Sequence, residues 1–427
     1  MPLPTVTAQR HHWKSFEMII KPYIKEFEKL GFGMFVHFGV YSLIGQGEWA
    51  RKLGTMPPEQ YDQLYHKFNP DPDWANHIAA VAKNAGCRYI TLTTRHHDGF
   101  SLYDTKGLND YDAMHACGKD LVGEFVNACH AYGLMPVFYH TLLDWKHPDY
   151  STNFPRYLEY LRASVKLLCT NYGKIGGIWF DGMWDKRDAD WEEDKLYHLI
   201  RTYQPEAMII NNTGLSHRGE LGNIELDSVT FERGKPQPIN MADSPKYIAS
   251  EMNEVLCDHW GYAKDDLDYK PTGRIIEELA ACRRYRSNFL LNIGPRGDGT
   301  LKPIDEAMFG IVGQWTAYFD EALHEPYPTK ITIKDKPDDF ILQNGSDYYL
   351  FCHHLPMLVD PNVGELQSAL YEDKFPFKPA IRTVRWLDCN DPLPFTQKDG
   401  ITTIKTNPFH YGHNLVVRVA KITTSSN

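Results

Sequence analysis

The strongest constraint in this chain is a regular alternation of short apolar segments and longer amphipathic segments over its first three-quarters. Strands that alternate with helices are typical of parallel sheets joined by right-handed crossovers. Eight strand candidates within roughly 260 residues match the size of a (β/α)8-like barrel. The connections from the fifth to the seventh strand are short or irregular, so we expect the barrel to be imperfect there. The predicted strands cover residues 32–39, 89–97, 135–141, 176–182, 207–212, 228–232, 247–252 and 288–294, and the predicted helices cover 74–85, 121–133, 157–172, 191–203 and 274–288.

The alternation stops after a last helical pattern at residues 315–323. Short β segments with turn residues between them follow from Pro326 onward, a pattern typical of an all-β unit. A chain of 427 residues also exceeds what one hydrophobic core usually serves. The sequence therefore predicts a catalytic barrel over residues 1–325 and a C-terminal β-sandwich over residues 326–427. Its expected strands cover residues 330–333, 347–352, 380–386, 400–406 and 414–420.

The net charge and the cysteine pattern indicate which partners the protein lacks and in which compartment it resides. A net charge of −10 without a basic run argues against a nucleic-acid partner, and no apolar stretch approaches the roughly 20 residues that span a membrane. The eight cysteines form no Cys-x-x-Cys pair and many lie in apolar segments, which is typical of reduced thiols. With no signal-peptide pattern at the first residues, we expect a cytoplasmic protein. A homo-oligomer stays an open alternative, with Trp145 or Trp184 at a subunit boundary.

Polar side chains gather where the predicted strands end. The clearest example is residues 176–182, Gly-Gly-Ile-Trp-Phe-Asp-Gly, in which an apolar run ends in Asp181. Because the carboxyl ends of barrel strands meet at one mouth, side chains far apart in the sequence are expected to share a pocket there. Burying carboxylates and histidines without use is costly, so this set predicts a functional site. The strand ends carry His37, His96, His97, Tyr139, Asp181, Glu232 and Glu251.

Two chemistries could use these residues. Metal-assisted hydrolysis could recruit His96, His97 and Asp181, but neighbouring residues of a regular strand point to opposite faces. The chain also lacks His-x-His and His-Glu-x-x-His. Glycoside hydrolysis needs two carboxyl groups across a sugar, roughly 5–5.5 Å apart when the anomeric configuration is retained. This second chemistry fits better, and it predicts no metal and no cofactor.

Several motifs resemble the α-L-fucosidases of glycoside hydrolase family 29. They are Gly-Phe-Gly-Met-Phe-Val-His-Phe-Gly at residues 31–39, Gly-Glu-Trp at 47–49, His-His-Asp-Gly-Phe at 96–100, Gly-Ile-Trp-Phe-Asp-Gly at 177–182, Trp-Gly-Tyr at 260–262 and Asn-Phe-Leu-Leu-Asn-Ile-Gly-Pro at 288–295. The resemblance implies a barrel followed by a β-sandwich and a fucosylated oligosaccharide or glycoconjugate as substrate. It makes Asp181 the nucleophile. It implies a fucose pocket formed by His37, Glu48, Trp49, His96, His97, Tyr139 and Trp179, with Phe289 as part of the surface that receives the C5 methyl group.

The general acid/base has two candidates. Thr230-Phe-Glu232 resembles a Thr-Pro-Glu motif that bears the acid in several family members, whereas Glu251 resembles a Trp-Glu motif in which Ser250 replaces the tryptophan. The resemblance favours Glu232. The chain also departs from the family after its fifth strand, where many members have Asn-Asp-Arg and residues 211–213 read Asn-Asn-Thr. Two alternatives stay open: Arg218 or Arg233 replaces that arginine, or the pocket binds one hydroxyl in a different way.

We therefore expect a retaining exo-α-L-fucosidase. The alternatives are a catalytically inactive fucose-binding protein and a metal-dependent barrel hydrolase.

Overall fold

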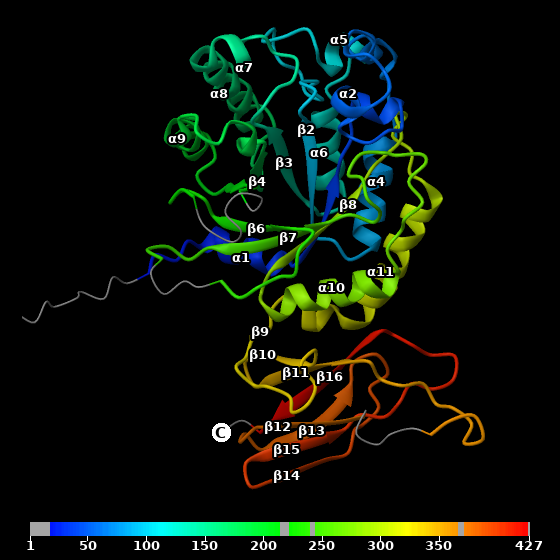
Figure 1. The fold of residues 1–427 in the computed structure, drawn as a ribbon. Coiled ribbons are helices and arrows are strands. Elements are labelled where there is room, and N and C mark those ends of the chain that lie inside the picture. Colours follow the sequence, from blue (N-terminus) through cyan, green and yellow to red (C-terminus); the bar gives the residue numbers. More distant parts are fainter. Residues whose placement is uncertain (1–17, 214–221, 240–243, 366–370, 426–427) are drawn as a thin grey trace, which may run out of the picture.

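Eight parallel strands close into a barrel in the order of the chain (Figure 1). The computed structural model describes residues 18–213, 222–239, 244–365 and 371–425. Strand β8 pairs with β1, with Phe289 opposite Phe32, and this pairing completes the ring. The predicted (β/α)8-like barrel is confirmed. Its strands are β1 (Phe32–Val36), β2 (Tyr89–Arg95), β3 (Met135–Thr141), β4 (Gly177–Asp181), β5 (Met208–Asn211), β6 (Ser228–Glu232), β7 (Ala249–Glu254) and β8 (Asn288–Ile293).

Helices surround most of the barrel. Side-chain caps start two of the longer ones: Asp120 accepts from the Gly123 amide before α6, and Asn153 accepts from the Arg156 amide before α8. The longer helices are α1 (Pro22–Leu30), α4 (Trp74–Asn84), α6 (Leu121–Ala131), α8 (Phe154–Thr170), α9 (Glu193–Tyr203), α10 (Thr272–Arg284) and α11 (Pro303–Leu323). The shorter ones are η1 (Val40–Leu43), α2 (Ala50–Leu53), α3 (Pro58–Tyr61), η2 (Leu64–Lys67), α5 (Ala113–Cys117), α7 (Asp149–Thr152) and η3 (Met183–Lys186).

The barrel is irregular between β5 and β7, as the sequence predicted. Among the described residues of these two connections, no helix follows β5 or β6. The pairing of β5 with β6 is limited to Ile210 opposite Ser228.

Side chains of the strands alternate between the barrel interior and the helix layer. The interior is filled by aromatic and aliphatic groups that include Phe35, Tyr139 and Trp179. The next residue along β3 or β4, such as Phe138 or Phe180, joins the separate core between strands and helices. This period of two decides which side chains reach the barrel mouth.

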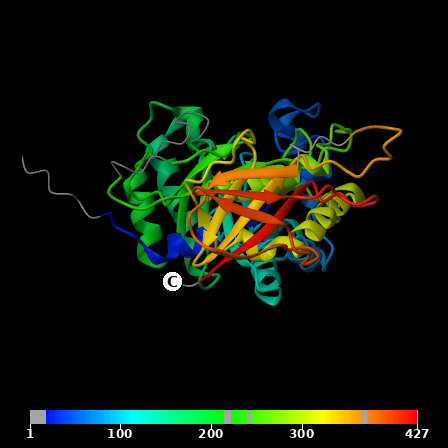
Figure 2. The same cartoon turned by 90° about the horizontal axis from the view of Figure 1, so that it is seen from below.

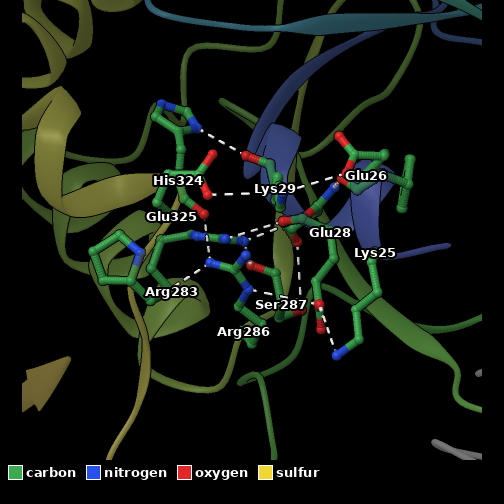
Figure 3. A network of polar contacts seen from close by, with 12 residues as sticks. Lys25, Glu26, Glu28, Lys29, Arg283, Arg286, Ser287, His324 and Glu325 are labelled. Atoms are coloured by element: carbon green, nitrogen blue, oxygen red, sulfur yellow. Dashed lines mark hydrogen bonds and ion pairs between the residues drawn. The ribbon is translucent and has the colours of Figure 1, made fainter. Parts of the chain in front are cut away.

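A polar network holds the base of the barrel together (Figure 3). The buried Arg283 guanidinium donates to the backbone oxygens of Leu323, Ser287 and Glu28, at 2.7, 2.8 and 3.0 Å. It therefore joins α1, the turn before β8 and the end of α11. His324 adds a bond from its Nδ1 to the Lys29 backbone oxygen at 3.1 Å.

Two antiparallel sheets follow the barrel, as predicted. The five-stranded sheet has the order β13-β16-β11-β10-β9 and the three-stranded sheet the order β12-β15-β14. Figure 2 views the molecule from the side of these sheets, and α10 and α11 lie between them and the barrel strands (Figure 1). The strands are β9 (Tyr327–Pro328), β10 (Phe340–Asn344), β11 (Asp347–His353), β12 (Glu372–Pro376), β13 (Ile381–Trp386), β14 (Phe395–Lys398), β15 (Ile401–Lys405) and β16 (Val417–Thr424).

The strand prediction was less accurate in this part of the chain. The expected strand at residues 330–333 is wrong, since these residues form no strand. Strands β9, β10, β12 and β14 were not predicted. The exposed faces of β12 and β14 carry charged and polar side chains, which weakens the apolar pattern that identifies a strand. Within the described residues, no helix has the length and apolar character needed to cross a membrane.

Candidate active site

One cavity opens at the carboxyl ends of the barrel strands. It gathers nine of the eleven predicted site residues from five strand ends and the loops that follow them. Both carboxyl candidates at strand tips, Asp181 and Glu232, face it. The cavity is lined by Phe35, His37, Glu48, Trp49, His96, His97, Tyr139, Trp179, Asp181, Trp184, Asn212, Glu232, Asn253 and Trp260.

Asp181 is the last residue of β4, and its carboxylate is held by hydrogen-bond donors. Gly182 follows with φ at +105°, a turn that residues with a side chain rarely adopt, so the chain leaves the barrel sharply at this point. Tyr139 donates its hydroxyl to Oδ2 at 3.1 Å, and His97 Nε2 lies 3.4 Å from the same oxygen. Burial acts to raise the pKa of Asp181, but His97, Tyr139 and Asn212 outweigh it and lower that pKa below its usual value. Asp181 is therefore ionised near neutral pH.

Glu232 ends β6 and has the opposite electrostatic environment. Burial raises its pKa to about 7, and the nearby charge of Asp181 adds to this effect. A hydrogen bond from Asn212 Nδ2 to Oε2 at 2.7 Å, together with the Arg233 charge, acts against the rise. One carboxyl that stays ionised and one that holds its proton near neutral pH are the pair that acid-assisted nucleophilic attack requires.

The two carboxyl groups lie close together. Asn212 Nδ2 also donates to Asp181 Oδ1 at 3.3 Å, so oxygens of both carboxyls are within hydrogen-bond distance of one nitrogen. The distance between these two oxygens, Asp181 Oδ1 and Glu232 Oε2, cannot exceed the two hydrogen-bond lengths laid end to end. Such a close approach favours the retaining arrangement over the roughly 6.5–9.5 Å separation of the carboxyls in inverting glycosidases.

His37 and Glu48 present acceptors to the same cavity. His37 Nδ1 lies 2.6 Å from Asn292 Oδ1, and Asn292 in turn donates its amide to the Trp260 backbone oxygen at 2.7 Å. This orientation assigns the proton of His37 to Nδ1 and leaves Nε2 as an acceptor; burial lowers the His37 pKa to about 3, so the ring is neutral. Glu48 Oε2 accepts from the backbone amides of Trp260 and Gly261 at 3.1 and 2.8 Å.

His96 and His97 both reach the cavity because β2 ends at Arg95. The expectation that they point to opposite faces assumed a strand that continues through residue 97 and is wrong. Both residues lie beyond the strand, after a register shift against β3. The His96 ring stacks on Tyr139 at 5.3 Å, and its buried Nδ1 has no hydrogen-bond partner. His97 Nδ1 is 2.8 Å from the Thr141 hydroxyl, which itself donates to the Leu143 backbone oxygen at 2.6 Å.

Tryptophan side chains form one wall of the cavity. Trp49 stacks on Trp184 with ring centroids 5.7 Å apart, and the Trp184 indole donates to Asp181 Oδ1 at 3.4 Å. Trp145 supports Trp49 from the other side at 4.9 Å. Hydroxyl-binding polar groups beside aromatic faces are typical of a carbohydrate site.

A sequence profile of the alpha-L-fucosidase family matches residues 4–321, about three-quarters of the chain. The chain belongs to the alpha-L-fucosidase family. The resemblance inferred from the sequence is thereby confirmed.

Named relatives agree with this family. The bovine tissue alpha-L-fucosidase is 26% identical over 394 residues, which cover 83% of this chain and 81% of that protein. The structure of alpha-L-fucosidase isoenzyme 1 from Paenibacillus thiaminolyticus has a TM-score of 0.78 at 26% identity and covers 95% of this chain and 99% of its own. A Bacteroides thetaiotaomicron GH29 alpha-L-fucosidase, trapped as a covalent intermediate with 2-fluoro-fucosyl fluoride, shares the fold with a TM-score of 0.79 at 20% identity, covering 95% and 97% of the two chains.

Two predicted site residues of this alpha-L-fucosidase family member lie away from the cavity. Phe289 points outward from β8 into the core between strands and helices and stacks on Phe32 at 5.9 Å, so its prediction as a pocket residue is wrong. Glu251 lies inside the barrel beneath the cavity. Its Oε1 accepts from the Trp179 indole at 2.8 Å and its Oε2 from the Tyr89 hydroxyl at 2.5 Å, so it holds the pocket wall instead of facing the substrate.

Of the two arginines that could replace the missing one, Arg233 is described by the structure and does not line the cavity. Arg233 lies at its rim, over the Trp260 ring at 5.2 Å, and donates to the Asp258 backbone oxygen at 2.5 Å. Arg218 falls outside the described residues.

Sequence reasoning also missed residues that the structure places in the site. Trp260 stood within a motif that was recognised, and Trp184 follows Asp181 by only three positions. Both could have been inferred from their proximity to those motifs. Asn212 and Asn253 lie in no recognised motif, so the sequence did not indicate that they line the cavity. The missed residues are Phe35, Trp184, Asn212, Asn253 and Trp260.

The three residues considered for a metal-dependent reaction do not form a cluster of ligand atoms. Among the described residues, the group whose potential ligand atoms gather within 4.8 Å consists of Asp339, Cys352 and Asp373, which belong to the C-terminal part of the chain.

Proposed function

We propose that this protein is a retaining exo-α-L-fucosidase that hydrolyses terminal α-L-fucosyl residues of oligosaccharides or glycoconjugates. The observation that carries the proposal is the pair Asp181 and Glu232. They face one cavity from the ends of β4 and β6, with an oxygen of each within hydrogen-bond distance of one Asn212 nitrogen and with pKa values shifted in opposite directions.

In the first step Asp181 acts as the nucleophile. A carboxylate oxygen of Asp181 forms a bond to C1 of the fucosyl group while the bond from C1 to the glycosidic oxygen breaks. The departing oxygen takes the proton of Glu232, so the aglycone leaves as a neutral alcohol and Glu232 becomes a carboxylate. Tyr139 and His97 keep the Asp181 carboxylate oriented for attack.

In the second step Glu232 acts as the base. A water molecule attacks C1, its proton passes to Glu232, and the ester bond to Asp181 breaks. Two displacements at the same carbon return L-fucose with the configuration of the substrate. Both carboxyls are then in the protonation states with which the cycle began.

The remaining lining residues bind the sugar. The His37 Nε2 acceptor, the second Glu48 oxygen and the unpartnered nitrogen of His96 suit the vicinal hydroxyls of fucose. The C5 methyl group needs an apolar contact, which Phe35 and Trp260 offer in place of Phe289. The Trp179 indole, which lines the cavity, donates to Glu251 Oε1 at 2.8 Å and is thereby held from the barrel interior.

Azide rescue tests the assignment. With p-nitrophenyl α-L-fucoside, Asp181→Gly should lose hydrolysis and form β-fucosyl azide, because azide then attacks from the vacated face. Glu232→Ala should form the retained α-azide, because azide replaces the activated water. Glu251→Ala is the matched control and should form neither product. Rescue of Glu251→Ala with the retained azide would overturn the assignment of Glu232.

The same assay separates the two alternatives. A fucose-binding protein without activity would bind fucose and release no p-nitrophenol, and a metal-dependent hydrolase would lose turnover on prolonged chelation.

Two further assignments concern the molecule outside the site. We propose that the C-terminal sheets form a β-sandwich, because one apolar core includes side chains from both, such as Ile341 and Leu350 from one and Phe375 and Ile404 from the other. We also propose a cytoplasmic location, supported by eight unpaired cysteines of which most are buried. Assembly through Trp145 or Trp184 stays a prediction that analytical ultracentrifugation would test.

A further inference from the structure

The sequence departs from its family's pattern at residues 211–213, and the structure places one of these side chains between the two carboxyls. Asn212 directly follows β5, which lies between β4 and β6 in the barrel. Its side chain is 3% exposed. The Nδ2 atom donates to Glu232 Oε2 at 2.7 Å and to Asp181 Oδ1 at 3.3 Å. A single amide group therefore uses both of its hydrogens on the two groups that carry out the reaction.

The orientation of this amide is fixed by its neighbours. The Thr230 hydroxyl donates to Asn212 Oδ1 at 2.9 Å, so the carbonyl side of the amide is already occupied. The reverse orientation would bring a carbonyl oxygen against the ionised Asp181 carboxylate. The Asn212 backbone amide also donates to the Phe180 oxygen at 2.7 Å, which ties the residue to the strand that carries Asp181.

We propose that Asn212 is a positioning residue of the fucosidase reaction, which holds Asp181 and Glu232 at a fixed separation and directs the proton of Glu232 to Oε1. The inference rests on the proposed function. Because Oε2 accepts the amide hydrogen, the proton resides on the other oxygen of Glu232. That oxygen is the one available to the glycosidic bond.

The neutral amide also suits the movement of charge during the first step. Before attack the negative charge is on Asp181, and after attack it is on Glu232, because the first group has become an ester and the second has lost its proton. The pair carries one negative charge throughout. A donor that contacts both positions can stabilise the charge at either one. An aspartate at this position would add a second negative charge and could not donate when ionised.

The charged and titratable groups around the pair set the expected pH response. Asp181 faces His97 and Tyr139, and Glu232 faces Arg233 and Glu48 in addition to Asp181. Each hydrogen bond from Asn212 lowers the pKa of the carboxyl that accepts it. Removal of the amide should therefore raise both pKa values. Since activity needs Asp181 ionised and Glu232 protonated, both limbs of the pH profile should move to higher pH.

Asn211 provides a matched control. It is the preceding asparagine on the same strand end, and it is equally buried, with 1% exposure. Its Nδ2 donates to the Tyr197 hydroxyl at 3.0 Å, on the helix side of the strand and away from the cavity. An alanine there removes a buried amide from the same strand without touching either carboxyl.

The test measures kcat and KM of the full chain from pH 4 to 9 with p-nitrophenyl α-L-fucoside. For Asn212→Ala we expect kcat to fall about ten- to hundredfold, as for loss of a hydrogen bond to a charged group, with a smaller change in KM. Both limbs should shift upward by about half a pH unit or more. Thr230→Val should shift them in the same direction by less, because the amide stays but its orientation is no longer fixed. Asn211→Ala should leave both limbs in place.

The possible outcomes are distinct. Unshifted limbs in a folded Asn212→Ala variant, or limbs that move equally in Asn211→Ala, would overturn the inference. If Asn212→Ala does not fold, unshifted limbs in Thr230→Val overturn it instead. A wild-type chain that does not hydrolyse the fucoside would contradict the proposed function, and azide rescue of Asp181→Gly in an active chain establishes that function independently of Asn212.

Discussion

The mouth of the barrel and its interior each hold a glutamate whose pKa is raised to about 7, and only one of the two can act on a substrate. Glu232, at the mouth, lines the cavity, and Asn212 binds only one of its two oxygens. Glu251, in the interior, has both oxygens occupied, by Tyr89 and by Trp179. Both pKa values rise chiefly through burial.

This comparison shows that a raised pKa is not sufficient evidence for a general acid. Desolvation alone produces it, whether or not the proton can be delivered. What distinguishes Glu232 is access and a free oxygen. Glu251 instead orients Trp179, a wall of the pocket, and so supports the site without contacting the sugar.

The largest expected difference between the two glutamates is in turnover. Glu232→Gln should lower kcat on the order of 10²- to 10⁴-fold with a poor leaving group, because proton donation is lost. The loss should be smaller for p-nitrophenyl fucoside, whose leaving group needs little protonation. Glu251→Gln should retain most of its turnover with both substrates. Steady-state kinetics on the two substrates checks this, and a larger leaving-group dependence in Glu251→Gln would reverse the comparison.

The pH profile gives the next largest effect. Glu232 must be protonated in the free enzyme, so kcat/KM should fall about tenfold per pH unit above its pKa of about 7. On the acid side activity should persist to below the usual pKa of an aspartate, since that of Asp181 is lowered. Glu251→Gln should keep the alkaline limb, whereas Glu232→Gln should abolish it. An alkaline limb that disappears only in Glu251→Gln would contradict the assignment.

The free energy of unfolding should depend on pH in a way that reports the ionisation of Glu251. The folded pKa of Glu251, about 7, lies above the 4.5 of an unperturbed glutamate, so its contribution is fully present below pH 4.5 and is lost as pH rises through about 7. Across this window the free energy of unfolding should fall by roughly 3 kcal/mol on account of this group. Urea unfolding at pH 4.5, 6 and 8 should show a flatter dependence for Glu251→Gln than for the wild type. An unchanged slope would mean that the pKa of Glu251 does not differ between the folded and the unfolded chain.

The smallest expected effects concern Phe289, in the core outside the barrel, and Trp49, in the wall of the cavity. Phe289→Leu should leave KM unchanged and lower the free energy of unfolding by about 1 kcal/mol, because it only repacks a core contact. Trp49→Leu should raise KM severalfold with little loss of stability, since Trp49 lines the cavity. A rise in KM for Phe289→Leu would contradict this placement and indicate that Phe289 contacts the sugar.

Much of the fold could be predicted because strand ends and apolar periods are local signals. The bounds of β3 and β6 agree with the predicted segments, and Asp181 was correctly predicted at a strand tip. Whether the Phe289 side chain points into the barrel or toward the helices could not be predicted from the neighbouring sequence. It depends on the register with which β8 closes the barrel against β1. A shift of the β8 register by one residue would have turned the Phe289 side chain into the barrel.

The residues of the site that belong to distinctive motifs could be predicted from the sequence, whereas the hydrogen bonds that connect them could not. His37, Glu48 and Asp181 belong to segments whose composition is distinctive. An asparagine at a strand end has no such signature, and the contacts of Asn212 exist only where β4, β5 and β6 converge. The choice between Glu232 and Glu251 likewise needed the positions of Tyr89 and Trp179 in space.

Helix α11 connects the barrel to the C-terminal sheets by more than chain continuity. Its Trp315 indole donates to the Val417 backbone oxygen of β16 at 2.8 Å, and Phe340 and Phe351 of the sheet belong to the same apolar core as the barrel helices. A truncated protein that ended near residue 325 would expose the apolar side chains of this helix to water and would be prone to aggregate. We therefore expect scanning calorimetry of the intact chain to record one melting endotherm for the barrel and the C-terminal sheets together.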